Sequence, residues 1–263
     1  MSKRNTQQRR HIIITELNQL GEVSVEQLAK RFETSEVTIR KDLAALENSG
    51  LLLRRYGGAI SLPQEITEAK EQQVSKQKLA IAKQAASLIK EHNRIIIDSG
   101  RTTSTIVEHL SDIKGLVVMT NALSVADKLN ELENEPTLLM TGGTWDPTSE
   151  SFQGKIAEQV LRSYDFDQLF IGADGIDIER GTTTFNELIG LSQVMAEVAR
   201  EVIVLVESDK VGRKIPNLEL AWRNVHTLIT DDGLAANIIS AIKQQGVNVI
   251  CASTQSISKT EKL

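Results

Sequence analysis

The segment RIIIDSGRTTSTIVEHL, residues 94–110, places polar side chains directly after a short apolar run. Asp98, Ser99 and Gly100 are followed by Arg101 and two threonines, where a helical pattern begins. Hydroxyl groups, a guanidinium and the N–H groups at a helix start are groups that bind phosphate in proteins. The segment therefore predicts an anion site, although the same residue types also make an ordinary turn with a helix cap.

A second group of residues has the chemistry of DNA recognition. In TSEVTIRKDLAALENSG, residues 34–50, a helix that turns Ile39 and Leu43 toward a core presents Val37 and Arg40 on its opposite face. In the major groove, small apolar groups can contact thymine methyls, and arginine reaches guanine edges or phosphates. The alternative is an amphipathic helix with a solvated outer face.

The residues after this helix favour the DNA-binding interpretation. The segment GLLLRRYGGAI, residues 50–60, combines a short apolar strand, a basic turn and a glycine pair, which predicts a wing that contacts phosphate or the minor groove. The predicted DNA-binding residues are Ser35, Glu36, Val37, Thr38, Arg40, Lys41, Arg54, Arg55 and Tyr56.

Three helices must position this face. Apolar residues spaced for one helix face predict a helix over about 6–20, and Gly21 ends it. A second helix follows the capping-box pattern Ser24-x-x-Gln27, and the third begins near Ser35. Three short helices and a basic hairpin predict a winged helix-turn-helix over residues 1–60.

The rest of the chain has the pattern of a larger α/β domain. Residues 61–76 are expected to form a linker and residues 77–263 an effector-binding and oligomerisation domain, with a helical pattern over about 68–92. Apolar runs then alternate with helical stretches, which predicts a mostly parallel sheet flanked by helices. The predicted strands are 95–98, 116–120, 137–140, 168–172, 202–206, 227–230 and 247–251.

Ligands bind such sheets beyond the carboxyl ends of the strands, so the loops at those ends are the candidate site. Five of them carry polar side chains or glycines that allow close backbone approach. The predicted effector-binding residues are Asp98, Ser99, Gly100, Arg101, Thr102, Thr103, Thr120, Asn121, Gly142, Gly143, Asp174, Asp177, Glu187 and Lys210. Any one loop alone could be turn chemistry; their convergence favours a sugar-phosphate or polyol-phosphate site.

Composition narrows the class of protein. The net charge of the chain is −5, but residues 1–60 hold ten Lys and Arg against seven Asp and Glu. The N-terminal part is therefore basic, and the acidic total does not exclude a nucleic-acid partner. Cys251 is the single cysteine, and the histidines lack ligand spacing, so neither a disulfide nor a metal site is predicted. No cofactor is expected. Without an apolar run of about 20 residues or a signal peptide, a cytoplasmic protein with no membrane partner is expected.

Both halves resemble the DeoR family of bacterial transcriptional repressors. The N-terminal resemblance rests on SEVTIRKDL and RRYGGA, and the C-terminal one on IIDSGRTT, VMTNALSVADKL, GADGIDIERGTTTFNE and VIVLVESDKVGRK. The family's effector domain is similar to sugar-phosphate isomerases of the ribose-5-phosphate isomerase type. The resemblance implies a homo-oligomer, dimer or tetramer, that binds double-stranded operator DNA and is released by a phosphorylated sugar or polyol such as glucitol 6-phosphate.

An enzymatic alternative follows from the same loops. Aldose–ketose isomerisation needs a carboxylate base and groups that stabilise an enediolate, and Asp174, Asp177, Glu187 and Lys210 could supply them. A sensor whose ligand is consumed would destroy its own signal, so a non-enzymatic repressor is the prediction. A domain that serves only for dimerisation, and activation in place of repression, remain alternatives.

Overall fold

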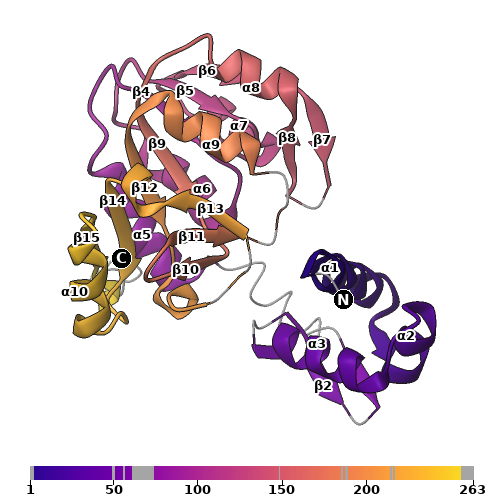
Figure 1. Ribbon diagram of the computed structural model, residues 1–263. Helices are drawn as coiled ribbons and strands as arrows, with labels where there is room; N and C mark the ends of the chain where they lie inside the picture. The colour runs from indigo at the N-terminus through magenta and orange to yellow at the C-terminus, as the bar shows by residue number, and fades with distance from the viewer. Residues whose placement is uncertain are drawn as a thin grey trace, which may run out of the picture. The chain divides into compact units, whose positions relative to one another are not determined.

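The computed structural model describes residues 3–48, 51–55, 57–60, 74–147, 149–184, 186, 189–213, 215 and 217–255. The chain divides into two compact units, Met1–Val74 and Ser75–Leu263 (Figure 1). The predicted combination of a small helix-turn-helix unit and a larger α/β unit is confirmed.

The N-terminal unit contains the three predicted helices and the predicted hairpin. Its helices are α1 (Lys3–Leu20), α2 (Val25–Arg31) and α3 (Glu36–Asn48). Strands β1 (Glu22–Ser24), β2 (Leu53–Arg55) and β3 (Gly58–Ile60) form an antiparallel sheet in the order β1-β3-β2. Helix α1 begins earlier than predicted, because its polar first turn adds no apolar position that sequence periodicity could register.

One apolar core holds this unit together. Ile13 and Leu17 of α1 pack with Ile39 and Leu43 of α3, and all four are almost fully buried. Ser24 is the N-cap of α2, as predicted, but its side chain makes no capping hydrogen bond, so the capping box predicted there is wrong. Strand β1 ends at Ser24, and the extended backbone of that residue leads directly into α2.

The larger unit is built on a seven-stranded sheet in the order β15-β14-β12-β9-β4-β5-β6, with every neighbouring pair parallel. All seven predicted strands are present. They are β4 (Arg94–Ile97), β5 (Val117–Thr120), β6 (Thr137–Met140), β9 (Phe166–Gly172), β12 (Ala199–Leu205), β14 (Thr227–Asp231) and β15 (Asn248–Ala252). The chain starts in the centre at β4 and extends first to one side and then to the other.

Helices cover both faces of this sheet. Ile95 and Ile97 belong to the core beneath α5 (Lys76–Ala86), the 3-10 helix η1 (Thr105–His109) and α7 (Leu123–Asn130), whereas Ile96 belongs to the opposite core. That second core includes residues of α8 (Lys155–Leu161), α9 (Gly190–Glu197) and α10 (Ala236–Gln244). Because successive side chains of β4 point to opposite faces of the sheet, this strand contributes to two separate apolar cores.

Two features of this unit differ from the sequence prediction. The helix expected over 68–92 ends at Ala86, and Ser87–His92 form turns in which Ile89 is still buried; residues 68–73 lie outside the described part. A second sheet, β10 (Gly175–Asp177), β11 (Gly181–Thr184) and β13 (Asn217–Ala221), was not predicted, nor was the hairpin of β7 (Thr144–Asp146) and β8 (Ser151–Gln153). None of these strands carries the continuous apolar run that predicted the strands of the large sheet.

Candidate functional site

The outer face of α3 has the composition predicted for DNA contact. Ile39 and Leu43 are buried, whereas Val37 is 58% exposed and lies on the same side as the exposed Arg40 and Lys41. An isolated valine on a solvent-facing helix surface gains nothing from water, but it can contact a thymine methyl. The geometry fits a recognition helix.

The polar residues at the start of α3 are occupied within the helix. The Ser35 hydroxyl accepts a hydrogen bond from the Thr38 N–H at 3.2 Å and lies 2.9 Å from the Thr38 hydroxyl. Glu36 forms an ion pair with Arg40, with 2.6 Å between Oε2 and Nη2. Ser35 therefore caps the helix through Thr38, and Glu36 holds the arginine that is predicted to reach DNA.

The wing is the hairpin of β2 and β3. Arg54 and Arg55 lie in strand β2, so the prediction that they form the turn is wrong; Tyr56 lies outside the described residues. Gly57 takes a left-handed φ of +80°, and a Cβ on Gly58 would lie 2.1 Å from the Val23 carbonyl oxygen. Glycine at these two positions lets the chain reverse and lets β3 lie close against β1.

The strand order of the larger unit places a switch point between β4 and β9. From β4 the chain proceeds through β5 and β6 on one side, and β9 begins the other side. Connections on the two sides leave in opposite directions, which opens a crevice for ligands at the carboxyl ends. The loop that begins with Asp98 follows β4, and the loop that contains Asp174 follows β9.

The turn after β4 carries the predicted phosphate-binding residues. Gly100 has a left-handed φ of +135°, and the Ser104 N–H of the short helix α6 (Arg101–Ser104) donates to the Gly100 carbonyl at 3.0 Å. Thr102 and Thr103 lie in the turn between these two residues. The Thr103 hydroxyl donates to the Gly100 carbonyl at 2.9 Å, so this hydroxyl, predicted to bind an anion, shapes the turn.

The turn after β4 is tied to the end of β5. The Ser99 N–H donates to Asn121 Oδ1 at 3.0 Å, and Asn121 is 1% exposed. The Asn121 Nδ2 is buried and has no hydrogen-bond partner in the part of the chain that the structure describes. Thr120 accepts from the Ala122 N–H at 3.2 Å, which fixes the backbone beside it. These loops are thus brought together, and the Asn121 side chain also lowers the pKa of Asp98, so its amide lies beside that carboxyl.

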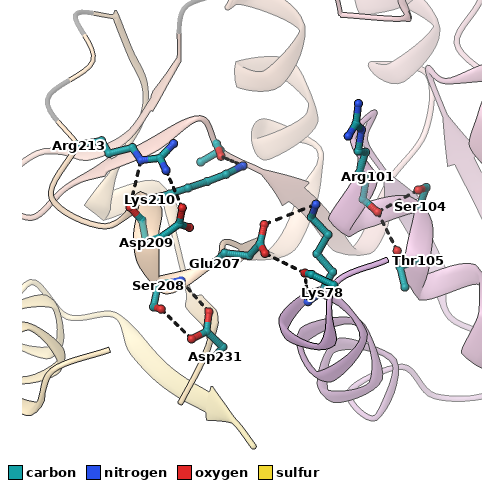
Figure 2. A network of polar contacts seen from close by, with 12 residues as sticks. Lys78, Arg101, Ser104, Thr105, Glu207, Ser208, Asp209, Lys210, Arg213 and Asp231 are labelled. Atoms are coloured by element: carbon teal, nitrogen blue, oxygen red, sulfur yellow. Dashed lines mark hydrogen bonds and ion pairs between the residues drawn. The ribbon is translucent and has the colours of Figure 1, made fainter. Parts of the chain in front are cut away.

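Lys210 and Asp174 lie at the ends of β12 and β9. Lys210 Nζ donates to the Ala173 carbonyl at 3.2 Å, and Figure 2 shows this side chain extending across the end of the sheet. Burial lowers the pKa of Lys210, while Asp174 and Glu207 oppose that shift. Asp174 accepts from the Thr184 hydroxyl at 2.8 Å. A lysine with few surrounding water molecules gains more from an anionic partner than an exposed one.

Glu219 on β13 joins these residues, although the sequence reasoning did not select it. Its carboxyl accepts from the Ser192 hydroxyl at 2.8 Å and from the Thr182 hydroxyl at 3.3 Å. Burial first, and then the charges of Asp98 and Asp174, raise the pKa of Glu219 to about 8, so this carboxyl lies near both loops. Burial also raises the pKa of Asp98 to about 6. A single glutamate between the leucines of NLELAW was the available signal.

Three predicted residues have local explanations. Asp177 forms an ion pair with Arg180 at 2.7 Å and accepts from the Glu179 N–H, all within the hairpin of β10 and β11. A Cβ on Gly143 would lie 2.6 Å from the Gln153 carbonyl oxygen, so close packing requires glycine there. At Gly142 there is space for a Cβ, but its left-handed φ of +59° favours glycine. Glu187 lies outside the described residues.

Neither a metal site nor a membrane span emerges from the described residues. Within them, no three His, Cys, Asp or Glu side chains are grouped so that they could hold a metal ion. None of the helices described there is long and apolar enough to cross a bilayer.

A winged helix-turn-helix joined to a parallel α/β unit with a polar cluster at its switch point defines a class, the DNA-binding regulators that carry a ligand-sensing domain. Residues 9–65 match the DeoR-like helix-turn-helix domain, and residues 73–232 match the DeoR C-terminal sensor domain. The chain belongs to the DeoR family of transcriptional regulators. The prediction of a regulator and not an enzyme is thereby confirmed.

Two named transcriptional regulators are similar to this chain over most of its length. The chain is 39% identical to the "Putative aga operon transcriptional repressor" of Escherichia coli O157:H7, across 93% of each chain. It is 34% identical to the HTH-type transcriptional regulator GlpR of Haloferax volcanii, across 86% of this chain and 90% of the relative. A ribose 5-phosphate isomerase from Methanocaldococcus jannaschii is 19% identical, with a TM-score of 0.39 over 52% of this chain and 54% of that one. Similarity at that level carries no argument about activity.

Proposed function

We propose that this regulator represses an operon for the use of a sugar or sugar alcohol, and that a phosphorylated sugar or polyol releases it from the operator. Support for the effector comes from the carboxyl edge of the sheet. There the N–H groups of Thr102 and Thr103, the buried Nδ2 of Asn121 and the half-buried Lys210 supply donors, and Asp98 and Asp174 supply acceptors for hydroxyl groups.

The mixture of donors and acceptors indicates the class of ligand. A phosphate needs cations and N–H donors, which the turn after β4 and Lys210 provide. The hydroxyl groups of a sugar or polyol can donate to the carboxylates of Asp98 and Asp174, and the protonated carboxyl of Glu219 can donate to a hydroxyl oxygen. We take glucitol 6-phosphate as the first candidate. The aga operon named for one relative makes other phosphorylated sugars the comparison set.

On the DNA side, the proposal assigns base contact to Val37, Arg40 and Lys41 and phosphate contact to the wing. Winged helices of this kind bind paired half-sites when the protein is a symmetric oligomer. We therefore propose a homodimer or a tetramer, in which the effector favours an arrangement that no longer matches the operator. A shift from 1:99 to 99:1 requires a difference of about 5.5 kcal/mol in effector binding between the two states.

A titration of operator binding tests this function. Fluorescence anisotropy of a labelled operator is measured with glucitol 6-phosphate, glucitol, glucose 6-phosphate or inorganic phosphate present. We expect a phosphorylated sugar or polyol to release the DNA and the unphosphorylated compound to have no effect. A regulator whose operator affinity is unchanged by every phosphorylated compound would contradict the proposal.

A double variant locates the effector. Arg101→Ala with Thr102→Ala removes a guanidinium and a hydroxyl from the turn after β4, so operator binding should persist and effector release should be lost. The matched control is Arg162→Ala with Thr137→Ala. Arg162 is exposed and pairs with Glu197 at the amino end of β9, and Thr137 is exposed at the amino end of β6. The control should retain release at the wild-type effector concentration.

A further inference from the structure

Glu207 connects two distant parts of the sensor unit. This residue lies two positions after the end of β12, next to the buried Val206, and its Oε2 accepts a hydrogen bond from the Ser75 hydroxyl at 2.9 Å. Its Oε1 lies 3.7 Å from Nζ of Lys78. Both Lys78 and Glu207 are largely buried, with side-chain exposures of 20% and 18%. The contacts therefore lie in a region of reduced screening, where charge has a larger effect than at the surface.

Ser75 has a structural role at the start of α5. It is the N-cap of this helix, and its hydroxyl oxygen accepts from the Lys78 N–H at 3.2 Å while its proton goes to Glu207. Loss of an N-cap side chain typically costs about 1 kcal/mol of helix stability. Helix α5 is the first described element after residues 61–73, the segment that leads from the DNA-binding unit. The bond to Glu207 thus holds the point at which the chain enters the sensor unit.

The opposite side of Glu207 is held by the sheet. The N–H and hydroxyl of Ser208 both donate to Asp231 at the end of β14, each at 2.7 Å. Two residues further on, Lys210 reaches the Ala173 carbonyl, and the charges of both Glu207 and Lys78 act on it. Figure 2 shows Glu207 between the side chains of Lys210 and Lys78. One carboxylate is therefore shared by the proposed anion site and the start of α5.

We infer that Glu207 transmits effector occupancy from Lys210 to Ser75 and so to the chain that leads to the DNA-binding unit. This inference rests on the proposed function. A phosphate beside Lys210 repels the Glu207 carboxylate and competes with it for Lys78 and Lys210. The Ser208–Asp231 bonds keep the β12 side in place, so the change falls on the Ser75 side. There the hydroxyl loses its acceptor, and the first turn of α5 loosens.

Two variants separate transmission from a local effect of charge. Ser75→Ala removes the hydroxyl and leaves every charge in place, whereas Glu207→Gln removes the charge and keeps a hydrogen-bonding group. Ser163→Ala is the matched control, because this exposed hydroxyl donates only to the Gln159 carbonyl in the described part of the chain. Operator affinity is measured for each protein with and without glucitol 6-phosphate, and effector affinity is measured separately by calorimetry.

We expect the ratio of operator affinities without and with effector to fall at least fivefold in both Ser75→Ala and Glu207→Gln, while both still bind effector. Ser163→Ala should keep the wild-type ratio. In the wild type, effector should also speed hydrogen exchange of the Lys78 and Leu79 amides, which bond to Ser75. A wild-type ratio in Ser75→Ala, or unchanged exchange at α5, would overturn the inference alone. If no phosphorylated compound changed the operator affinity of the wild type, the proposed function would be overturned as well.

Discussion

Glu47 on α3 binds Arg54 of β2 at two points. Its Oε1 accepts from the Arg54 N–H at 3.0 Å, and its Oε2 accepts from Arg54 Nε at 2.6 Å. These hydrogen bonds, the backbone one first, lower the pKa of the Glu47 carboxyl, so Glu47 stays ionised. The two elements that are proposed to contact DNA are thus joined by one carboxylate.

The contact between Glu47 and Arg54 predicts the direction in which operator affinity changes when Glu47 is replaced. Removal of a negative charge near DNA normally strengthens binding. If Glu47 positions the wing, however, Glu47→Ala should weaken operator binding by about fivefold, because Arg54 is no longer held where it meets the DNA backbone. Operator affinity by anisotropy measures the effect. Glu26→Ala, which removes an exposed glutamate from α2, is the control and should leave binding unchanged or slightly stronger.

Arg40 should contribute directly to operator affinity. In the free protein it pairs with Glu36, and in the complex its guanidinium is expected to reach a guanine edge or a phosphate. Arg40→Ala should cost about 1–3 kcal/mol of operator binding if it contacts a base, and should relax specificity at one position. If it contacts phosphate, affinity should fall equally for all sequences. Lys83→Ala, an exposed residue of α5, controls for the change in net charge; undiminished operator binding by Arg40→Ala would refute the assignment.

Asp42 should be essential for the fold of the N-terminal unit. It is 2% exposed, and its two oxygens bind Arg9 Nε at 2.6 Å and Arg10 Nε at 2.8 Å. Asp42→Ala leaves the buried Arg9 without its partner, which typically costs about 3–5 kcal/mol. We expect urea unfolding to show an early transition for this unit and an unchanged one for the sensor unit. Asp112→Ala, at an exposed turn, should alter neither transition.

The sensor unit should lose stability as the pH rises. The pKa of Glu219 is raised from 4.5 to about 8, and that of Asp98 from 3.8 to about 6. The folded chain therefore holds these protons more tightly than the unfolded chain, and their stabilising contribution is lost as the pH rises from about 4 to 8. Each group contributes a slope of at most about 1.4 kcal/mol per pH unit.

The substitution Glu219→Gln separates the two groups. A glutamine stays neutral, so the variant should lose the decline in stability between pH 6 and 8 and keep the part below pH 6 that comes from Asp98. Because the two carboxyls interact, the remaining decline should also shift in pH. Thermal unfolding of both proteins between pH 4 and pH 8 measures how stability declines with pH. Parallel stability curves for Glu219→Gln and wild type would show that Glu219 does not carry the proton.

Much of the architecture was predictable because its signals are local. Apolar residues at helical spacing, such as Ile39 and Leu43, show which face of α3 is buried, and they thereby expose Val37 and Arg40. The seven strands of the large sheet were equally accessible, since each is a short apolar run. The polar residues Ser99, Thr102 and Thr103, which follow the apolar run that ends at Ile97, predicted the turn at the end of β4. Each of these features depends on neighbours within a few residues, which is the range over which periodicity and turn chemistry act.

The sequence by itself determined two units, their element types and a set of loops at the carboxyl ends of strands. Only the tertiary structure decided that β4 lies beside β9, which opens the switch point. It also placed Glu219 against the site and Ser75 against Glu207, 132 residues away. Such contacts depend on strand order and packing between segments remote in the chain. No local pattern records that information, because the same apolar runs are compatible with several orders of strands.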